Sequence, residues 1–347
     1  MNARKLAALV AAATTIALAA GAALAGATST QGTRASAGTL TVYSGREQEV
    51  VEDLFKQFEK ATGIDVSIRY GESAELAATL DEEGGSSPAD VFFAQDAGSL
   101  GAAALAGRLA PLPASILDKV APRFRDPAGR WVGTSGRARV IVYNTKLVKP
   151  ADLPASVFDL TKPRWKGKVG FPPTNASFQA FVTAMRLTAG EARTAAWLKA
   201  LKANKPRTYD KNLSVVEAVA AGEIQVGLVN HYYLYIVNGE QPGAPIANLF
   251  LKGGDPGALV NVAGAGIVTG ARHTAEAKRF LAYLLSPAGQ RYYNTAEEAE
   301  FPIVAGIKPR AGLPTLASIQ GPNIALGVLG KELQKTLALL SEAGFIS

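Results

Sequence analysis

The stretch "TLTVYSGREQEVVEDLFKQFEKATGIDVSIRYG", residues 39–71, carries the pattern that decides the fold. A short β-rich run (39–45) ends in a glycine, and the next segment places five apolar residues on one helical stripe: Val50, Val51, Leu54, Phe55 and Phe58. Gly63 is expected to end this helix in the left-handed conformation. Residues 64–71 then predict a second strand, so the stretch is a strand–helix–strand unit.

The same rhythm continues downstream. "SAELAATLDEEG" (73–84) predicts a helix with Ser73 as its N-cap, and "ADVFFAQ" (89–95) predicts a third strand. A β-α-β-α-β order predicts an α/β fold with a parallel sheet and helices on both faces. Ligands of such sheets bind beyond the carboxyl ends of the strands, so we look for functional side chains there.

Two longer strands, 137–145 and 258–269, are expected to cross between two lobes. They predict two α/β lobes joined by a two-strand hinge, with a cleft that ligand binding closes. The N-terminal lobe is predicted to combine 38–136 with 261–311, and the C-terminal lobe to combine 137–260 with 312–347.

The first 25 residues have the layout of a secretory signal peptide: Arg4 and Lys5, an apolar middle, and an Ala-x-Ala exit ending at Ala25. A membrane anchor is the alternative interpretation. A flexible leader is expected over 26–37. Since the chain has no cysteine, disulfides, thiolate metal sites and a lipid anchor on an N-terminal cysteine are excluded. The mature protein is therefore predicted to be free in the periplasm or outside the cell.

Charge and motifs exclude several function classes. The net charge of +7 falls to +5 without Arg4 and Lys5, and the remaining basic residues are scattered among acids, which indicates a solvated surface and not a nucleic-acid site. The segment "GTSGR" (133–137) does not match a nucleophile elbow, and neither a Walker loop nor HExxH occurs. A pair of glycosidase carboxylates remains open at this stage, although nothing singles one out.

The most informative motif is the tyrosine pair in "EIQVGLVNHYYLY", residues 223–235. Neighbouring side chains point to opposite faces of a strand and lie about 100° apart on a helix. Tyr232 and Tyr233 can therefore share a cleft near a strand-to-helix junction, where Asn230 is expected to be the N-cap. Ionised phenols are hard oxygen donors suited to ferric iron. A second pair, Tyr292-Tyr293, lies inside a predicted helix and is expected to pack.

From residue 39 to its end the chain resembles the ferric-iron-binding periplasmic proteins of bacterial ABC importers. The matching pieces are "LTVYSGR", "FEKATGI", "SPADVFFAQDAG", "LAPLP", "SGRARVIVYNT", "PRWKGKVGFPPTNASFQAF", "AVAAGEIQVGLVNHYYLY", "DPGALVNVAGAGI" and "FPIVAGIKP", in conserved order and spacing. The resemblance implies a two-lobed periplasmic binding protein type II fold and no enzymatic activity. It implies that a monomer delivers its ligand to an inner-membrane permease and its ATPase.

The resemblance also implies a site. The paired tyrosines of the family coincide with Tyr232 and Tyr233, and a third tyrosine of one subgroup coincides with Tyr143. A synergistic anion, carbonate or phosphate, is expected to complete the Fe(III) shell. The residues expected beside the anion or the metal are Asn175, Ala176, Ser177, Asn230, Arg137, Arg46 and Gln95.

This chain departs from the resemblance in its N-terminal lobe. Glu47 stands where one subgroup has a histidine ligand, Gln95 where it has a glutamate, and Gln48 where another has a tyrosine. Either Glu47 binds the metal, or the three tyrosines act with an anion or water, which we favour. His231 is expected to lie beside the metal or on the surface. The alternative function keeps the fold but binds an organic or anionic solute, such as thiamine or a phosphonate.

Overall fold

The structure is a computed structural model that describes residues 38–295 and 299–347. The predicted signal peptide and the predicted leader, 26–37, lie outside the described residues. Over the described ranges, no helix is both long enough and apolar enough to cross a membrane.

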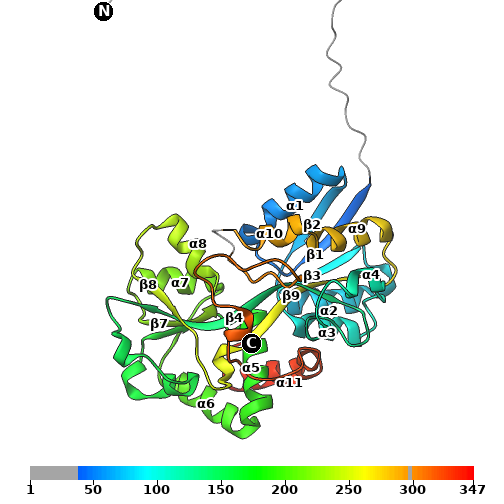
Figure 1. The fold of residues 1–347 in the computed structure, drawn as a ribbon. Helices are drawn as coiled ribbons and strands as arrows, with labels where there is room; N and C mark the ends of the chain where they lie inside the picture. Colours follow the sequence, from blue (N-terminus) through cyan, green and yellow to red (C-terminus); the bar gives the residue numbers. More distant parts are fainter. Residues whose placement is uncertain (1–37, 296–298) are drawn as a thin grey trace, which may run out of the picture. The chain divides into compact units, whose positions relative to one another are not determined.

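The opening stretch folds as predicted (Figure 1). β1 pairs in parallel with both β2 and β3, and a helix follows each strand. The bounds are β1 (Thr39–Ser44), α1 (Gln48–Thr62), β2 (Asp65–Tyr70), α2 (Ser73–Glu83), β3 (Val91–Ala94) and α3 (Ala97–Leu105). The apolar stripe of α1 is buried in the core. Because the three strands run in one direction, their carboxyl ends share one edge of the sheet.

The caps of these helices show what the local pattern decides. Gly63 ends α1 with φ of 74°, as predicted. The prediction that Ser73 caps α2 is wrong, because the cap position is Glu72 and Ser73 is the first helical residue. The Ser73 hydroxyl instead donates to the Gly45 carbonyl (3.2 Å) and accepts from the Gln95 amide (2.9 Å). It thereby ties the carboxyl end of β1 to that of β3.

One strand, β4 (Val132–Asn144), is shared by two halves of a continuous sheet. Up to Ala138 it pairs antiparallel with β9 (Val260–Ile267), and from Arg139 onward with β7 (Val226–Asn230). We call the part with β1, β2, β3 and β9 the first half-sheet, and the part built on β7 the second half-sheet. The predicted strand starting at 137 in fact begins five residues earlier, and the predicted domain boundaries stay a prediction.

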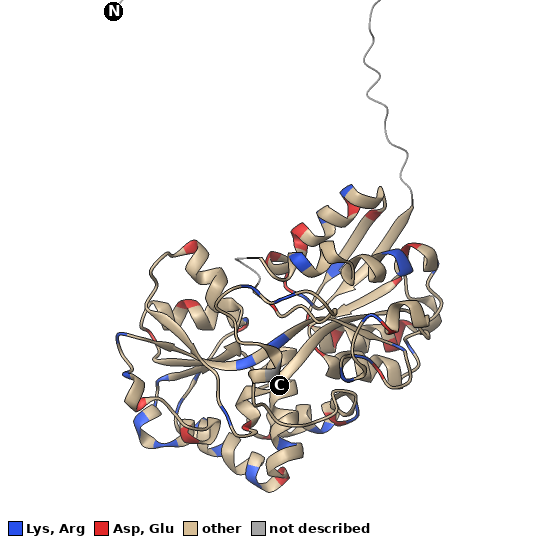
Figure 2. Ribbon diagram, viewed as in Figure 1, with Lys and Arg blue, Asp and Glu red and all other residues tan. Residues whose placement is uncertain are grey.

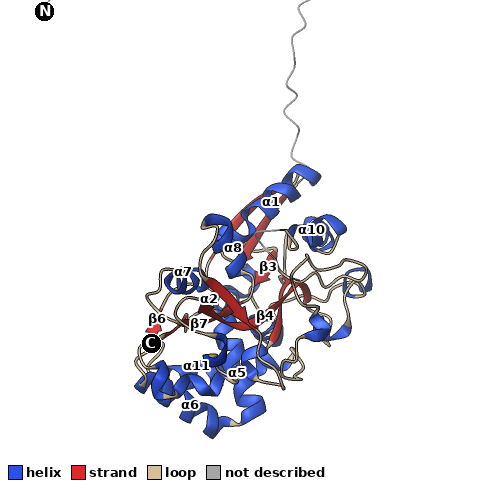
Figure 3. Ribbon diagram, turned by 60° about the vertical axis from the view of Figure 1, so that its left-hand side comes forward, coloured by secondary structure: helices blue, strands red, loops and turns tan. Residues whose placement is uncertain are grey.

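The second half-sheet contains short strands covered by helices. Its other strands are β5 (Val169–Phe171), β6 (Arg207–Thr208) and β8 (Ile246–Leu249), and its helices are α5 (Ala176–Ala189), α6 (Glu191–Ala203), α7 (Asn212–Ala220) and α8 (Tyr233–Glu240). A separate core forms here, in which the rings of Phe171 and Phe178 stack with centroids 4.6 Å apart. Figure 3 shows α5 and α6 side by side beneath the strands.

The C-terminal part of the chain returns to both halves. Its helices are α9 (Thr274–Leu284), α10 (Pro287–Tyr292) and α11 (Val328–Glu342), while the short α4 (Ala114–Leu117) lies earlier in the chain. α11 packs on α3 through the close approach of Gly330 to Gly101, and Glu332 of α11 pairs with Arg186 of α5 at 3.0 Å. One helix therefore contacts a helix from each half-sheet.

Candidate metal centre

The tyrosine pair lies where β7 gives way to α8. β7 ends at Asn230, and α8 starts at Tyr233 with Tyr232 at its cap position. The prediction that Asn230 caps this helix is therefore wrong, and the Asn230 side chain is used elsewhere. The two rings are tilted against each other, with centroids 4.3 Å apart and planes inclined by 31°, and both side chains are 0% exposed. The junction brings two adjacent phenols together, as the sequence predicts.

The second pair in the chain behaves differently. The rings of Tyr292 and Tyr293 are 5.8 Å apart and nearly perpendicular, at 84°. The Tyr292 hydroxyl donates to the carbonyl of Val50 in α1 (2.9 Å). These residues pack α10 onto the first half-sheet, so the pair serves as an internal control for what two adjacent tyrosines do outside a site.

Two side chains from the first half-sheet meet the phenols of Tyr232 and Tyr233. The Gln95 Nε2 atom donates to the Tyr232 oxygen, and the Tyr233 hydroxyl donates to Glu47 Oε1, both at 3.0 Å. Gln95 directly follows β3, and Glu47 lies in the turn after β1, so both come from the carboxyl ends of parallel strands. Four of the predicted site residues thus converge at one point between the half-sheets.

The protonation of this cluster follows from its burial. Burial raises the pKa of both phenols, well above the ordinary value for Tyr233, where Glu47 and Tyr232 raise it further. Burial also raises the pKa of Glu47, although its hydrogen bond with Tyr233 works in the opposite direction. The phenols therefore carry protons at neutral pH until a cation displaces them, because a metal ion stabilises the phenolate form.

A second carboxylate lies next to this cluster. Glu72 is partly buried at the carboxyl end of β2, and burial followed by repulsion from Glu47 raises its pKa to about 7. Lys211, just before α7, forms an ion pair with Glu49 at the start of α1 (3.1 Å). This pair joins the two half-sheets beside the cluster.

The structure does not bring Tyr143 to the pair, so the predicted three-tyrosine arrangement is wrong. Tyr143 lies opposite Val226 in the β4–β7 register, four residues before the Arg139–Asn230 pair, or about 13 Å along the strand. Its side chain packs against the core of the second half-sheet, whereas Tyr232 and Tyr233 belong to the other core. The family resemblance led to Tyr143 on β4, but it did not show how far Tyr143 lies from the end of β7.

The residues predicted beside an anion do converge. Asn175 caps α5 by accepting from the Ser177 amide (3.1 Å), and Ala176 between them is buried. The Asn230 side chain donates to the Ser177 hydroxyl (3.0 Å) and accepts from Arg139 Nη1 (3.2 Å). Within the described part of the chain, Nε and Nη2 of Arg139 have no hydrogen-bond acceptor. Buried donors beside a helix N-terminus are suited to a small anion.

Two residues that lie beside Asn230, Arg139 and Asn212, were not identified from the sequence. Arg139 is fully buried, which lowers its pKa to about 9, and its Nη1 also lies 3.5 Å from the Asn212 side-chain oxygen at the start of α7. The signal for Arg139 was present, because it lies two residues from Arg137 on the same strand face. Asn212 carried no comparable signal, since only the tertiary fold brings α7 here.

Arg137 and Arg46, predicted beside the anion, are engaged elsewhere. Both contact Glu300: Arg46 forms a buried ion pair with it, and Arg137 Nη2 lies 3.9 Å away. Arg137 also donates to the Gln95 carbonyl and stands over the Tyr232 ring, 5.9 Å from its centroid. The arginine that contacts Asn230 is therefore Arg139, whereas Arg137 contacts Gln95 and the Tyr232 ring.

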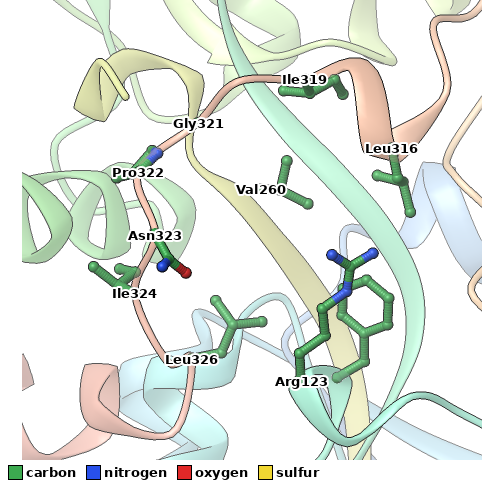
Figure 4. A pocket seen from close by; sticks show the side chains of 10 residues that line it. Arg123, Val260, Leu316, Ile319, Gly321, Pro322, Asn323, Ile324 and Leu326 are labelled. Atoms are coloured by element: carbon green, nitrogen blue, oxygen red, sulfur yellow. The ribbon is translucent and has the colours of Figure 1, made fainter. Parts of the chain in front are cut away.

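Outside this site, the described structure contains cavities but no other metal-binding cluster. Within residues 38–295 and 299–347, no cluster of three or more His, Cys, Asp or Glu side chains is placed to hold a metal ion. A separate cavity of about 230 Å³ lies between β9 and the loop before α11 (Figure 4). Its lining includes Arg123, Val260 and Leu316 but none of the predicted site residues. Acidic and basic residues are scattered among one another over the helices and loops (Figure 2), consistent with a solvated surface.

The chain is similar over most of its length to bacterial solute-binding proteins. The profile of the bacterial extracellular solute-binding protein family matches residues 40–291. The chain is 34% identical over 310 residues to the Fe(3+)-binding periplasmic protein of Serratia marcescens, covering 88% of this chain and 90% of that one. It is 36% identical to the major ferric iron-binding protein of Neisseria meningitidis serogroup B, with coverage of 88% and 92%.

Solved structures agree in fold. Iron-bound HitA from Pseudomonas aeruginosa superposes with a TM-score of 0.84 at 35% identity, covering 88% of this chain and 99% of that one. A Trichodesmium protein (IdiA, FutA) in complex with iron and citrate gives a TM-score of 0.73 at 31% identity, with coverage of 89% and 100%. These similarities confirm the predicted α/β fold class.

Proposed function

The chain belongs to the bacterial extracellular solute-binding protein family, and on that premise we propose that it captures ferric iron between its half-sheets and delivers it to an ABC importer. It is a transport component and not an enzyme, and it acts in the periplasm. The finer parts of the proposal are export by a cleaved signal peptide, a monomeric state, and hand-over to an inner-membrane permease with its ATPase.

The observation that carries this proposal is the meeting of two buried phenols with an opposing carboxylate. Tyr232 and Tyr233 come from the second half-sheet, and Glu47 approaches Tyr233 from the first at 3.0 Å. Two phenolates and a carboxylate provide three negative charges, which balance a trivalent cation and remove the cost of burying it bare. We therefore assign Tyr232, Tyr233 and Glu47 as ligands, with Gln95 held against the first phenolate.

The anion belongs beside this ligand set. Arg139 has two buried donor atoms without an acceptor in the described ranges, and Asn175, Ser177 and Asn230 adjoin it. Such donors cost stability unless an acceptor satisfies them. A small oxyanion such as carbonate or phosphate supplies the acceptors and completes the iron shell. The iron-and-citrate complex of the Trichodesmium relative makes a carboxylate anion a second possibility to test.

The test is an iron titration followed by visible absorption. Binding of Fe(III) to the purified mature protein should produce an intense phenolate-to-iron charge-transfer band. Tyr232→Phe and Tyr233→Phe should each weaken the band and lower iron affinity by at least about 100-fold, more than the loss of a supporting residue costs. Tyr143→Phe should leave both unchanged, because Tyr143 packs away from the pair.

The matched control is the packing pair. Tyr292→Phe and Tyr293→Phe alter the other tyrosine dipeptide and should retain the wild-type band. A wild-type protein that stays colourless with iron and carbonate, phosphate or citrate contradicts the proposal. In that case, calorimetry with thiamine, phosphate and a phosphonate in the absence of iron tests the alternative, since Arg139 and its neighbours suit an anionic solute.

A further inference from the structure

A buried carboxylate outside the ligand set organises the groups around it. Glu300 is 0% exposed, pairs with Arg46, accepts from the Ser135 hydroxyl and lies 3.9 Å from Arg137. Burial raises the pKa of Glu300, but Arg46 and then Arg137 outweigh it, so that the pKa falls below its usual value. Glu300 is therefore an ionised carboxylate held between two buried guanidinium groups.

Each of these arginines adjoins or contacts a residue of the proposed iron site. Arg46 immediately precedes Glu47 in the turn after β1. Arg137 donates to the backbone carbonyl of Gln95, whose side chain reaches the Tyr232 oxygen at 3.0 Å. Glu300 is thus connected through one arginine to each of the two side chains, Glu47 and Gln95, that contact the phenols.

The segment carrying Glu300 is also fixed against the tyrosine junction. The Ala299 carbonyl accepts from His231 Nε2 (2.9 Å), and the Phe301 ring stacks on the His231 ring at 4.5 Å. Phe301 exchanges two backbone hydrogen bonds with Gly136 of β4, at 2.7 and 2.9 Å. His231 directly precedes Tyr232, so residues 299–301 contact the backbone that places the phenols.

The backbone at Ala299 is strained, which indicates that the surrounding contacts hold this segment in place. Ala299 has φ of 44°, a left-handed conformation that a non-glycine residue rarely adopts. Its side chain is fully buried. The neighbouring His231 is held at both ring nitrogens, because its Nε2 atom lies 2.9 Å from the Ala299 carbonyl oxygen and its Nδ1 atom accepts from the Ala138 amide (3.3 Å).

We infer that Glu300 is a positioning residue for the iron site: through Arg46 and Arg137 it holds Glu47 and Gln95 in place against the two phenols. This inference rests on the proposed function. It assigns Glu300 no contact with iron. Its role resembles that of residues that orient metal ligands, whose loss typically lowers metal affinity by 10- to 100-fold.

The test compares two buried carboxylates that both contact strands or strand ends of the first half-sheet. Glu300→Gln keeps the size of the side chain and removes its charge. Asp90→Asn does the same at the opposite end of β3, about 17 Å from Gln95, where Asp90 binds His273 Nδ1 and the Thr41 amide, each at 2.9 Å. Iron affinity, measured by competition with citrate, and the charge-transfer band are recorded beside thermal stability for both variants.

Glu300→Gln should lower iron affinity by about 10- to 100-fold and shift the band maximum. Asp90→Asn should lower thermal stability but leave affinity and band at wild-type values. Wild-type affinity and band in Glu300→Gln, or equal losses in both variants, overturn the inference. Ser135→Ala removes one hydrogen bond to Glu300 and should give a smaller loss of the same kind. If Glu300→Gln does not fold, Ser135→Ala tests the inference in its place, and wild-type iron binding by Ser135→Ala then overturns the inference.

The two failures are distinguishable. If wild-type protein binds no iron, the proposed function itself is wrong. If wild-type protein gives the band and loses it in Tyr232→Phe while Glu300→Gln behaves as wild type, only the role of Glu300 is wrong.

Discussion

At the scale of residues, the site depends on carboxylates that are costly to bury without a cation. Glu47 and Glu72 lie at the carboxyl ends of neighbouring strands. Burial is the main cause that raises the pKa of each carboxyl group. A cation entering between the half-sheets relieves this cost, so part of the binding free energy comes from removing a penalty already present in the folded protein.

Glu72 gives a prediction about stability and pH. Its pKa of about 7 in the folded protein exceeds the ordinary value of 4.5, so folding is favoured below about pH 4.5 and this advantage disappears as the pH rises to about 7. Glu72→Gln should therefore raise the free energy of unfolding of the iron-free protein at pH 8 by about 1–2 kcal/mol, allowing for partial exposure, and change it little at pH 4.

Urea denaturation at the two pH values measures this difference. Glu75→Gln, three residues later on the exposed side of α2, is the matched control and should have little effect at either pH. Equal stabilisation by Glu72→Gln at pH 4 and pH 8 would show that the carboxylate charge is not the cause.

The sequence predicted the residues whose neighbours are set by a strand end. Tyr232 and Tyr233 were predicted from the local pattern of a strand followed by a helix, whereas Glu47 and Gln95, which also follow strands, were predicted from the family resemblance. Tyr143 was placed wrongly because the distance between two residues on paired strands depends on register, which the hydrophobic pattern of β4 does not reveal. Glu300 carried no signal, since its two arginines are distant in the chain.

At the scale of elements, the caps were the least predictable features. Ser73 and Asn230 are good N-cap residue types, yet neither caps its helix. The Ser73 side chain instead forms a hydrogen bond with Gly45, and the Asn230 side chain forms one with Ser177. Local propensity was overridden because these positions lie where several strand ends and helix starts meet. The first three strands and the helices between them, in contrast, were predicted from periodicity, whereas the antiparallel pairing of β3 with β9 was not.

The contact between α11 and α3 yields a prediction for packing. A Cβ atom at Gly330 would lie 2.5 Å from the Gly101 carbonyl carbon and 2.6 Å from the Ala102 amide nitrogen. Since backbone atoms cannot yield as a flexible side chain can, Gly330→Ala should destabilise the protein by about 1–3 kcal/mol despite alanine's better helix propensity.

Chemical denaturation of the iron-free protein measures this loss. Gly85→Ala is the control, because a Cβ atom there meets nothing within 4 Å. A Gly330→Ala variant as stable as wild type would mean that the two helices separate easily at this point.

At the scale of the whole molecule, contacts between the half-sheets set how firmly iron is retained. Besides the hydrogen bonds at the phenols, the Lys211–Glu49 ion pair joins the two halves at 3.1 Å. Both side chains are about half exposed, so the pair is worth about 0.2–1 kcal/mol at low salt. Lys211→Gln should therefore accelerate iron release by about 1.4- to 5-fold.

Stopped-flow transfer of iron to a chelator measures this rate. The difference should disappear in 1 M salt, where charges more than about 3 Å apart are screened. Lys56→Gln removes an exposed lysine whose ion pairs lie within α1 and should leave the rate unchanged. Acceleration that persists in 1 M salt would assign the effect to something other than charge.

The complete enclosure of the two phenol rings has a kinetic consequence. Because Tyr232 and Tyr233 have no exposed surface, a scavenger molecule in solution cannot reach an ion from their side, and exchange must wait for spontaneous parting of the protein around its cargo. Adding more scavenger then speeds exchange only to a plateau, and the height of that plateau is the opening frequency of the molecule. An acceptor that opens the protein by binding its surface, as proposed for the importer, should exceed this plateau.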